Sequence, residues 1–101
     1  MIKIRLSNDK IEVSGHAMYD EKGKDIVCSA VSSVVITSVN ACLMFDESSI
    51  KYDCRDGYIK IEILKHEREV DIVIKNMINM LKSLSNDYAK NIKIYEEVRW
   101  C

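Results

Sequence analysis

The chain contains no proline and only three glycines among its 101 residues. Interdomain linkers and low-complexity segments are usually rich in these two residue types, so nothing in the sequence divides the chain. A chain of this length suits one domain, which buries about two thirds of its unfolded surface. We therefore expect a single domain over residues 1–101.

Paired metal-ligand motifs are also missing. The chain has two histidines, no CxxC, and four widely spaced cysteines: Cys28, Cys42, Cys54 and Cys101. A structural zinc site needs four ligands in short, paired spacings, so we expect no metal. Free thiols without such pairing favour a reducing compartment, and no basic, apolar leader opens the sequence. We expect a cytoplasmic protein.

Neither sign of charge is in clear excess. The chain has 15 basic and 16 acidic side chains, which leave a formal net charge of −1. Such an even balance favours neither nucleic acid nor a strongly charged protein as partner. The aromatic residues are too scattered along the sequence to indicate a base-stacking platform. We therefore expect no direct contact with nucleic acid.

One segment, Ile26–Phe45, has twenty residues without a formal charge and is long enough to span a bilayer. It contains several serine, threonine and asparagine side chains, and it lacks basic clusters or aromatic anchors at its ends. A helix buried in a small domain explains this composition better than a membrane span. We expect no membrane partner.

Hydrophobic periodicity predicts two hairpins. Apolar and polar side chains alternate over residues 2–6 and 11–15, which is typical of half-buried strands. The same alternation recurs over residues 50–54 and 59–63, and Asp56-Gly57 between them is a common hairpin turn.

The remaining segments predict two helices and a closing strand. Ile26–Phe45 is too long for an ordinary strand, and Asp25 before it is a good helix N-cap. Apolar residues at three- and four-residue steps predict an amphipathic helix from about Arg68 to Ala89. A last strand runs from Ile92 towards Val98. The order ββαββαβ predicts an α+β fold in two layers, a mainly antiparallel sheet carrying two helices.

The chemistry of the chain centres on His16 and Cys28, which lie twelve residues apart with a polar, glycine-bearing loop between them. If Asp25 caps the helix, Cys28 falls in its first turn, where backbone N–H groups and the helix dipole favour a thiolate. The same N–H groups can hold an oxyanion. His16, at a strand end, can accept the thiol proton and later donate one to a leaving amine. Ser32, one helical turn after Cys28, can brace the sulfur.

Each of these residues also has a structural interpretation. Inert buried thiols outnumber reactive ones, so spacing alone favours a structural Cys28. Asp25 can be a simple helix cap, and Ser32 a small packing residue. Cys54 and His66 repeat the twelve-residue separation in reverse order, which we interpret as coincidence, because Cys54 belongs to an alternating strand and His66 to a solvated turn.

The stretch around Cys28 resembles the Prp family, the ribosomal-processing cysteine proteases. Gly15-His16-Ala17, a short loop with Gly23, and the pattern Asp25-x-x-Cys28-x-x-x-Ser32 agree with the family motif in residue type and spacing. Ser29 departs from it, because alanine is frequent after the family's cysteine. The rest of the chain supports the resemblance through its length and predicted element order.

This resemblance implies a cysteine endopeptidase that removes the N-terminal extension of large-subunit ribosomal protein twenty-seven. It implies cleavage after an aromatic pair by a Cys-His dyad through a thioester, with Cys28 as nucleophile and His16 as general base and acid. Gly15, Asp25 and Ser32 would support them. The family's homodimeric state and lack of any metal or organic cofactor are implied too. The segment that closes over substrate would contain Ala17, Met18, Tyr19 and Gly23.

Two other hypotheses compete with a peptidase. The chain can be a non-catalytic ribosome-assembly or regulatory module that keeps the motif for structural reasons. It can also be a redox-sensing protein that uses the Cys28 thiol, but this hypothesis needs a resolving cysteine nearby, and the motif contains none.

Overall fold

The computed structural model describes residues 1–16, 20 and 25–97 of the chain. Within them the predicted order ββαββαβ and the α+β class are confirmed. The elements in chain order are β1 (Ile2–Leu6), β2 (Lys10–Ser14), α1 (Ile26–Phe45), β3 (Ile50–Arg55), β4 (Tyr58–Ile63), α2 (Arg68–Asp87) and β5 (Ile92–Glu96).

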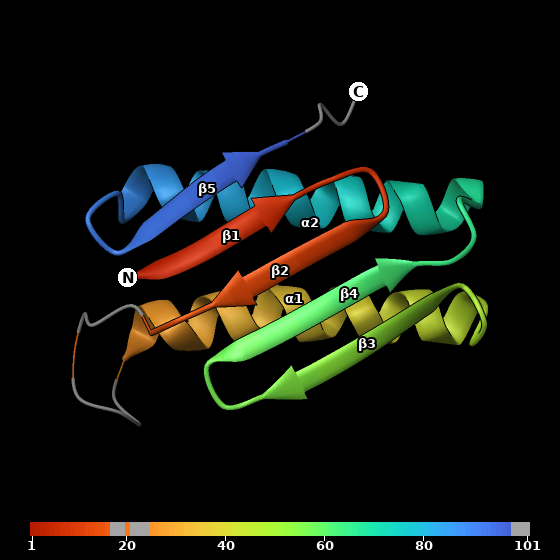
Figure 1. The fold of residues 1–101 in the computed structure, drawn as a ribbon, viewed down its shortest axis with the longest axis horizontal. Coiled ribbons are helices and arrows are strands. Elements are labelled where there is room, and N and C mark those ends of the chain that lie inside the picture. The colour runs from red at the N-terminus through yellow and green to blue at the C-terminus, as the bar shows by residue number, and fades with distance from the viewer. Residues whose placement is uncertain (17–19, 21–24, 98–101) are drawn as a thin grey trace.

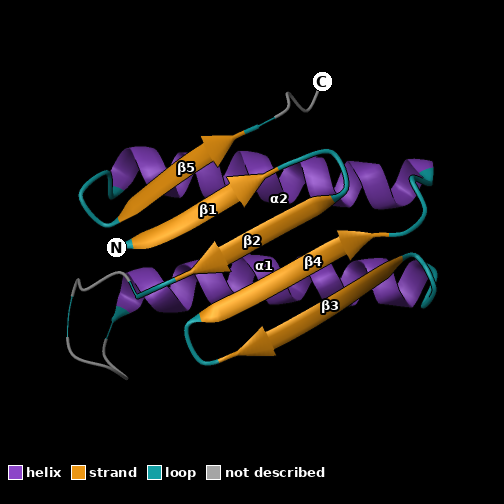
Figure 2. Cartoon of the chain, viewed as in Figure 1, coloured by secondary structure: helices purple, strands orange, loops and turns teal. Residues whose placement is uncertain are grey.

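The five strands form one sheet in the order β3-β4-β2-β1-β5. Only β1 and β5 are parallel to each other; the other neighbouring pairs are antiparallel, as expected of a mainly antiparallel sheet. Both helices lie on the same face of this sheet, α1 behind β4 and β2 and α2 behind β1 and β5 (Figures 1 and 2). The molecule therefore has two layers, and the opposite face of the sheet carries no helix.

The core forms between the helices and the inward side of each strand. Ile4 and Val13 are register partners on β1 and β2, and both are buried, whereas their neighbours Lys3 and Arg5 are exposed. This strict alternation is the same period of two that the sequence shows. Each fully buried aliphatic side chain of this kind stabilises the fold by about 1.5–3 kcal/mol relative to exposure.

Helix α1 is long and apolar enough to cross a membrane by length and composition, and it alone passes that test among the described residues. Core helices of soluble proteins pass the same test. One face of α1, which includes Val27, Val31, Val35 and Cys42, is buried in the core. This burial agrees with the core interpretation of the segment.

Three details differ from the sequence-based expectations. Strand β2 ends at Ser14 rather than Gly15, because Gly15 has a φ of +89° and turns the chain out of the strand. Helix α2 ends at Asp87, where Tyr88 leaves helical geometry. Helix α1 is buried on one face only, whereas the sequence suggested a buried helix, since Ile36 and Met44 on it are exposed. The expected extension of β5 to Val98 lies outside the described residues.

Candidate active site

A cleft of about 450 Å³ lies between the first half of α1 and the β3–β4 hairpin. The walls contain all five predicted site residues that the structure describes: Gly15, His16, Asp25, Cys28 and Ser32. The predicted substrate-loop residues Ala17, Met18, Tyr19 and Gly23 lie outside the described residues. The sheet and helix thus bring His16 and Cys28 to the same hollow, although the two residues belong to different elements.

Asp25 caps helix α1, as the sequence predicts. One oxygen of its buried carboxylate accepts hydrogen bonds from the backbone N–H groups of Val27 and Cys28, both at 3.0 Å. Its other oxygen faces the N–H of Asp20 at 3.4 Å. The cap holds the first turn of α1 in place and with it the half-buried Cys28.

The same cap changes what the helix N-terminus can do chemically. The sequence suggested that first-turn N–H groups can hold an oxyanion. In the structure the N–H of Cys28 donates to the Asp25 carboxylate, and the N–H of Ser29 donates to the Asp25 backbone carbonyl at 3.1 Å. Both donors already have partners, so the structure does not support an oxyanion site built from them.

The backbone conformation at position 15 requires a glycine. Its φ is +89°, which a residue with a side chain rarely adopts, and a Cβ there would lie 2.4 Å from the carbonyl oxygen of Met1. Its N–H donates to the carbonyl oxygen of Gly57 at 2.9 Å. Gly15 therefore joins the end of β2 to the β3–β4 turn and sets where His16 leaves the sheet.

The imidazole of His16 lies against Gly57 in the turn of the β3–β4 hairpin. A Cβ built on Gly57 would lie only 2.9 Å from Nε2 of His16. The absence of a side chain at Gly57 leaves the space that the ring uses. Sequence reasoning identified Gly57 only as a turn residue, because nothing along the chain shows that this turn faces the end of β2.

Other cleft residues were missed for the same reason. The alternation of residues 50–54 predicts only a strand position for Cys54, yet Cys54 is exposed and lines the cleft that also holds Cys28. Arg55 lines the cleft as well, and its guanidinium contacts the Asp53 carboxylate at 2.6 Å, which lowers the pKa of Asp53. On α1, the exposed Ile36 extends the apolar wall one turn beyond Ser32.

A thiol in the first turn of a capped helix and a histidine across one cleft are the arrangement found in cysteine hydrolases. The class defined by this fold and site is thus a small α+β protein with the groups needed for thiol-dependent peptide cleavage.

Comparison with known proteins identifies the family. The profile described as "Cysteine protease Prp" matches residues 1–93. A protein of Mycoplasma genitalium named ribosomal processing cysteine protease Prp is 31% identical over 99 residues, covering 96% of this chain and 97% of its own. The protein of that name from Bacillus subtilis is 30% identical over 102 residues, covering 90% of this chain and 91% of its own. The chain belongs to the Prp family and is a cysteine protease.

Solved structures share the fold. The essential ribosomal processing protease Prp from S. aureus with a covalently linked product peptide superposes with a TM-score of 0.85 at 24% identity, covering 95% of this chain and 97% of that one. A structure of the S. aureus protease with a substrate peptide gives a TM-score of 0.79 at 23% identity, with the same coverage. The family membership selects a protease over the non-catalytic module and the redox sensor.

Proposed function

We propose that this protease removes the N-terminal extension of large-subunit ribosomal protein twenty-seven, cutting after an aromatic pair. The observation that carries the proposal is the single cleft lined by both His16 and Cys28. The relatives from Mycoplasma genitalium and Bacillus subtilis, named for ribosomal processing, support the substrate class. The peptide complexes of the S. aureus protease support a peptide as the ligand of the cleft.

In the proposed reaction the Cys28 thiol transfers its proton to His16, and its sulfur attacks the scissile carbonyl carbon. The tetrahedral intermediate collapses as His16 donates the proton to the leaving amine, and a thioester remains on Cys28. His16 then takes a proton from a water molecule whose oxygen attacks the thioester. The C–S bond breaks, the carboxylic product leaves, and His16 returns the proton to the Cys28 sulfur. Asp25 positions Cys28 through the cap, and Ser32 lines the wall one turn further along α1.

The cleft also offers a place for an extended peptide. His16 follows β2, an interior strand, so the open edge near the site is not β2 but β3, the first strand in the sheet order. Cys54 and Arg55 of β3 line the cleft. A peptide lying along this edge can form main-chain hydrogen bonds, while Ile36 and other apolar wall residues receive its aromatic side chains.

The proposed enzyme acts in the cytoplasm as a homodimer. Helix α1 leaves apolar side chains exposed near its C-terminal end, where Met44 is 88% and Phe45 49% exposed. A second copy of the chain would remove this apolar surface from water. Sedimentation equilibrium of the full chain tests the assembly: a monomer at all accessible concentrations contradicts it.

Incubation with a peptide that spans the ribosomal extension tests the catalytic assignment. We expect Cys28→Ala and His16→Ala each to abolish cleavage, because the first removes the nucleophile and the second its proton acceptor. Neither substitution should lower the unfolding midpoint much, since His16 is exposed and Cys28 only half-buried. Product formation, followed by mass spectrometry, is the measurement.

Cys54→Ala is the matched control, because it removes an exposed thiol from the same cleft. We expect it to retain cleavage. If wild type cleaves no faster than Cys28→Ala, or if Cys54→Ala loses as much activity as Cys28→Ala, the catalytic assignment is wrong.

A further inference from the structure

The face of the sheet that carries no helix is strongly basic. Figure 1 shows the face of the sheet that no helix covers. Side chains at alternate positions of the strands point away from the core, towards this face. Its charged strand residues comprise seven cations and three carboxylates: Lys3, Arg5, Lys10, Lys51, Arg55, Lys60 and Lys93 with Glu12, Asp53 and Glu62. The excess of four positive charges contrasts with the net charge of −1 of the whole chain.

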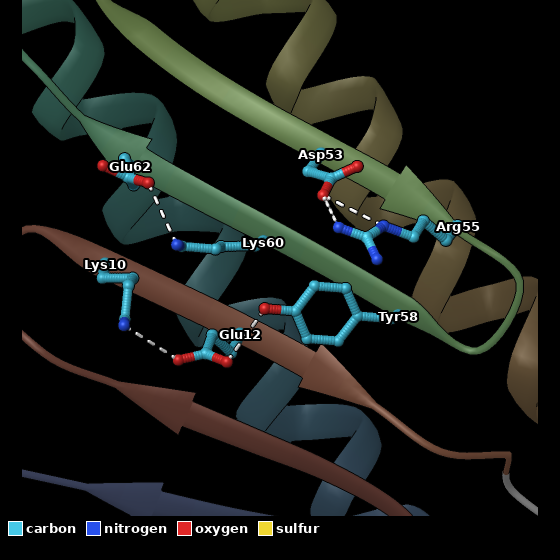
Figure 3. A network of polar contacts seen from close by, with 7 residues as sticks. All are labelled: Lys10, Glu12, Asp53, Arg55, Tyr58, Lys60 and Glu62. Carbon is cyan, nitrogen blue, oxygen red and sulfur yellow. Dashed lines mark hydrogen bonds and ion pairs between the residues drawn. The ribbon is translucent and has the colours of Figure 1, made fainter.

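Each of the three carboxylates is paired with a cation on the same face, as Figure 3 shows. The contacts are Lys10–Glu12 at 3.1 Å, Arg55–Asp53 at 2.6 Å and Lys60–Glu62 at 3.1 Å. The remaining four cations are Lys3, Arg5, Lys51 and Lys93. Among the residues that the structure describes, no carboxylate lies within 4.0 Å of their nitrogen atoms.

Three of these unpaired cations gather on β1 and β5, at one edge of the face. Lys3 is the register partner of Lys93, and Arg5 the partner of Tyr95. The Arg5 guanidinium lies 5.5 Å from the centre of the Tyr95 ring, and the Lys93 ammonium lies 5.6 Å from it. We call these four residues the basic stripe. All four side chains are exposed.

The contacts of Arg5 and Lys93 with the Tyr95 ring stabilise the basic stripe, but its like charges do not favour the fold. Like charges side by side on neighbouring strands repel each other and weaken strand pairing, as at Lys3 and Lys93. Surface positions of this kind accept neutral or acidic residues without loss of packing. A concentration of unpaired cations around an exposed aromatic ring is therefore better explained by a ligand than by stability.

We propose that the basic stripe binds single-stranded RNA. Lysine and arginine neutralise backbone phosphates, and the Tyr95 ring provides a face on which a base can stack, a feature that an acidic protein would not use. The choice of RNA rests in part on the proposed function, since an enzyme that processes a ribosomal protein meets ribosomal RNA. The net charge of the whole chain does not reveal this feature, because the alternation of side chains along each strand places these basic residues on one face of the sheet.

None of the four stripe residues lines the cleft, so bound RNA leaves His16 and Cys28 accessible to a peptide. The basic stripe would hold the protease on its ribonucleoprotein substrate while the cleft receives the extension. Tethering of this kind raises the local concentration of the peptide at the cleft without a new contact to the peptide itself.

Fluorescence anisotropy with a labelled single-stranded RNA of about 12 nucleotides tests the proposal on the full chain, at salt concentrations from about 50 to 200 mM. We expect Lys3→Gln and Lys93→Gln each to weaken binding and to reduce the salt slope by about one, because each removes one phosphate contact. Tyr95→Leu should weaken binding about tenfold through loss of stacking, whereas Tyr95→Phe should retain it.

Lys51→Gln is the matched control, since it removes an exposed, unpaired cation of the same face at the opposite edge of the sheet. If this control weakens binding as much as Lys3→Gln, or if the chain binds polyglutamate or anionic phosphatidylserine vesicles as tightly as RNA, the basic stripe is not an RNA site. Cleavage of the free peptide is measured in parallel and should be unchanged by the substitutions in the basic stripe. Normal cleavage without RNA binding overturns this inference alone, and RNA binding without cleavage by wild type overturns the proposed function alone.

Discussion

At the scale of single residues, the candidate active site depends on the lack of a side chain at Gly57. The ring of His16 uses the space next to Gly57, where a Cβ would lie 2.9 Å from Nε2. Gly57 also has a φ of +71°, which side chains rarely adopt. Two separate requirements therefore select glycine at this position: the turn of the hairpin and the position of the imidazole.

We predict that Gly57→Ala lowers cleavage by about tenfold to a hundredfold, because the added methyl group pushes the His16 ring away from its present position. The positive φ should also lower the free energy of unfolding, by about 1–2 kcal/mol. Steady-state kinetics on the extension peptide and chemical denaturation measure the two effects separately.

The double variant His16→Ala/Gly57→Ala separates backbone strain from displacement of the ring. Once the imidazole is gone, Gly57→Ala should cause only the stability loss that arises from φ, with no further loss of activity. Unchanged cleavage by a folded Gly57→Ala protein would show that the position of the ring against Gly57 does not matter for turnover.

At the scale of elements, the N-terminus of α1 is organised around one buried carboxylate. Asp25 is 6% exposed and accepts two backbone hydrogen bonds from the first turn. Its negative charge lies at the N-terminus of α1, 3.0 Å from the backbone nitrogen of Cys28, and offsets the positive end of the helix dipole. The geometry therefore supports a positioning role for Asp25 more than an activating one.

We predict that Asp25→Ala lowers the free energy of unfolding by about 0.5–2 kcal/mol, the usual loss when a helix cap is removed. Asp25→Asn should keep most of this stability, because asparagine caps helices about as well as aspartate. Urea denaturation measures both variants.

Cleavage by the same two variants distinguishes a cap from a charge. If Asp25 acts as a cap, Asp25→Asn retains activity and Asp25→Ala loses part of it, since only the second loosens the turn that holds Cys28. Equal loss of activity in both variants, with the Asn variant fully folded, would instead point to a role for the negative charge.

At the scale of the whole molecule, His66 links segments that are far apart in the sequence. Its Nε2 lies 2.7 Å from the Asp9 carboxylate in the β1–β2 turn, and its Nδ1 lies 2.8 Å from the Asp71 carboxylate in the first turn of α2. The hydrogen bond to Asp9, followed by that to Asp71, raises the pKa of His66. The imidazole thus joins the sheet layer to the helix layer, and both carboxylates favour its protonated form.

We predict that this link makes stability depend on pH. Because the pKa of His66 is raised by folding, its contribution is fully present below the unfolded pKa of about 6.5 and is lost as pH rises through the higher folded pKa. His66→Gln should therefore lower the unfolding midpoint at pH 6 and have a smaller effect at pH 9. The link is exposed to solvent, so we expect about 1 kcal/mol or less.

Denaturation across this pH range gives the measurement, and the Asp9→Asn/Asp71→Asn background is the control. With both carboxylates removed, His66→Gln should have no pH-dependent effect on stability. If the difference in unfolding free energy between wild type and His66→Gln grows towards pH 9, the assignment is wrong.

The sequence by itself was sufficient for the elements and for the two residues that we propose as catalytic, His16 and Cys28. Period-two alternation and three- and four-residue apolar steps are local signals, so they survive without knowledge of the fold. Asp25 before an uncharged run marks the start of α1 for the same reason, since its bonds reach only two and three residues along the chain. The Gly-His and Asp-x-x-Cys motif, read locally, led to the Prp family.

Tertiary structure decided which residues surround them. The sheet order places the β3–β4 hairpin beside the end of β2. Gly57 and Cys54 therefore line the same cleft as His16, which lies about forty residues before them in the chain. The pairing of the strands also decided that unpaired cations gather on the face of the sheet that no helix covers. Strand pairing and sheet order depend on contacts between segments that are distant in the sequence. No local sequence pattern shows which distant segments will meet.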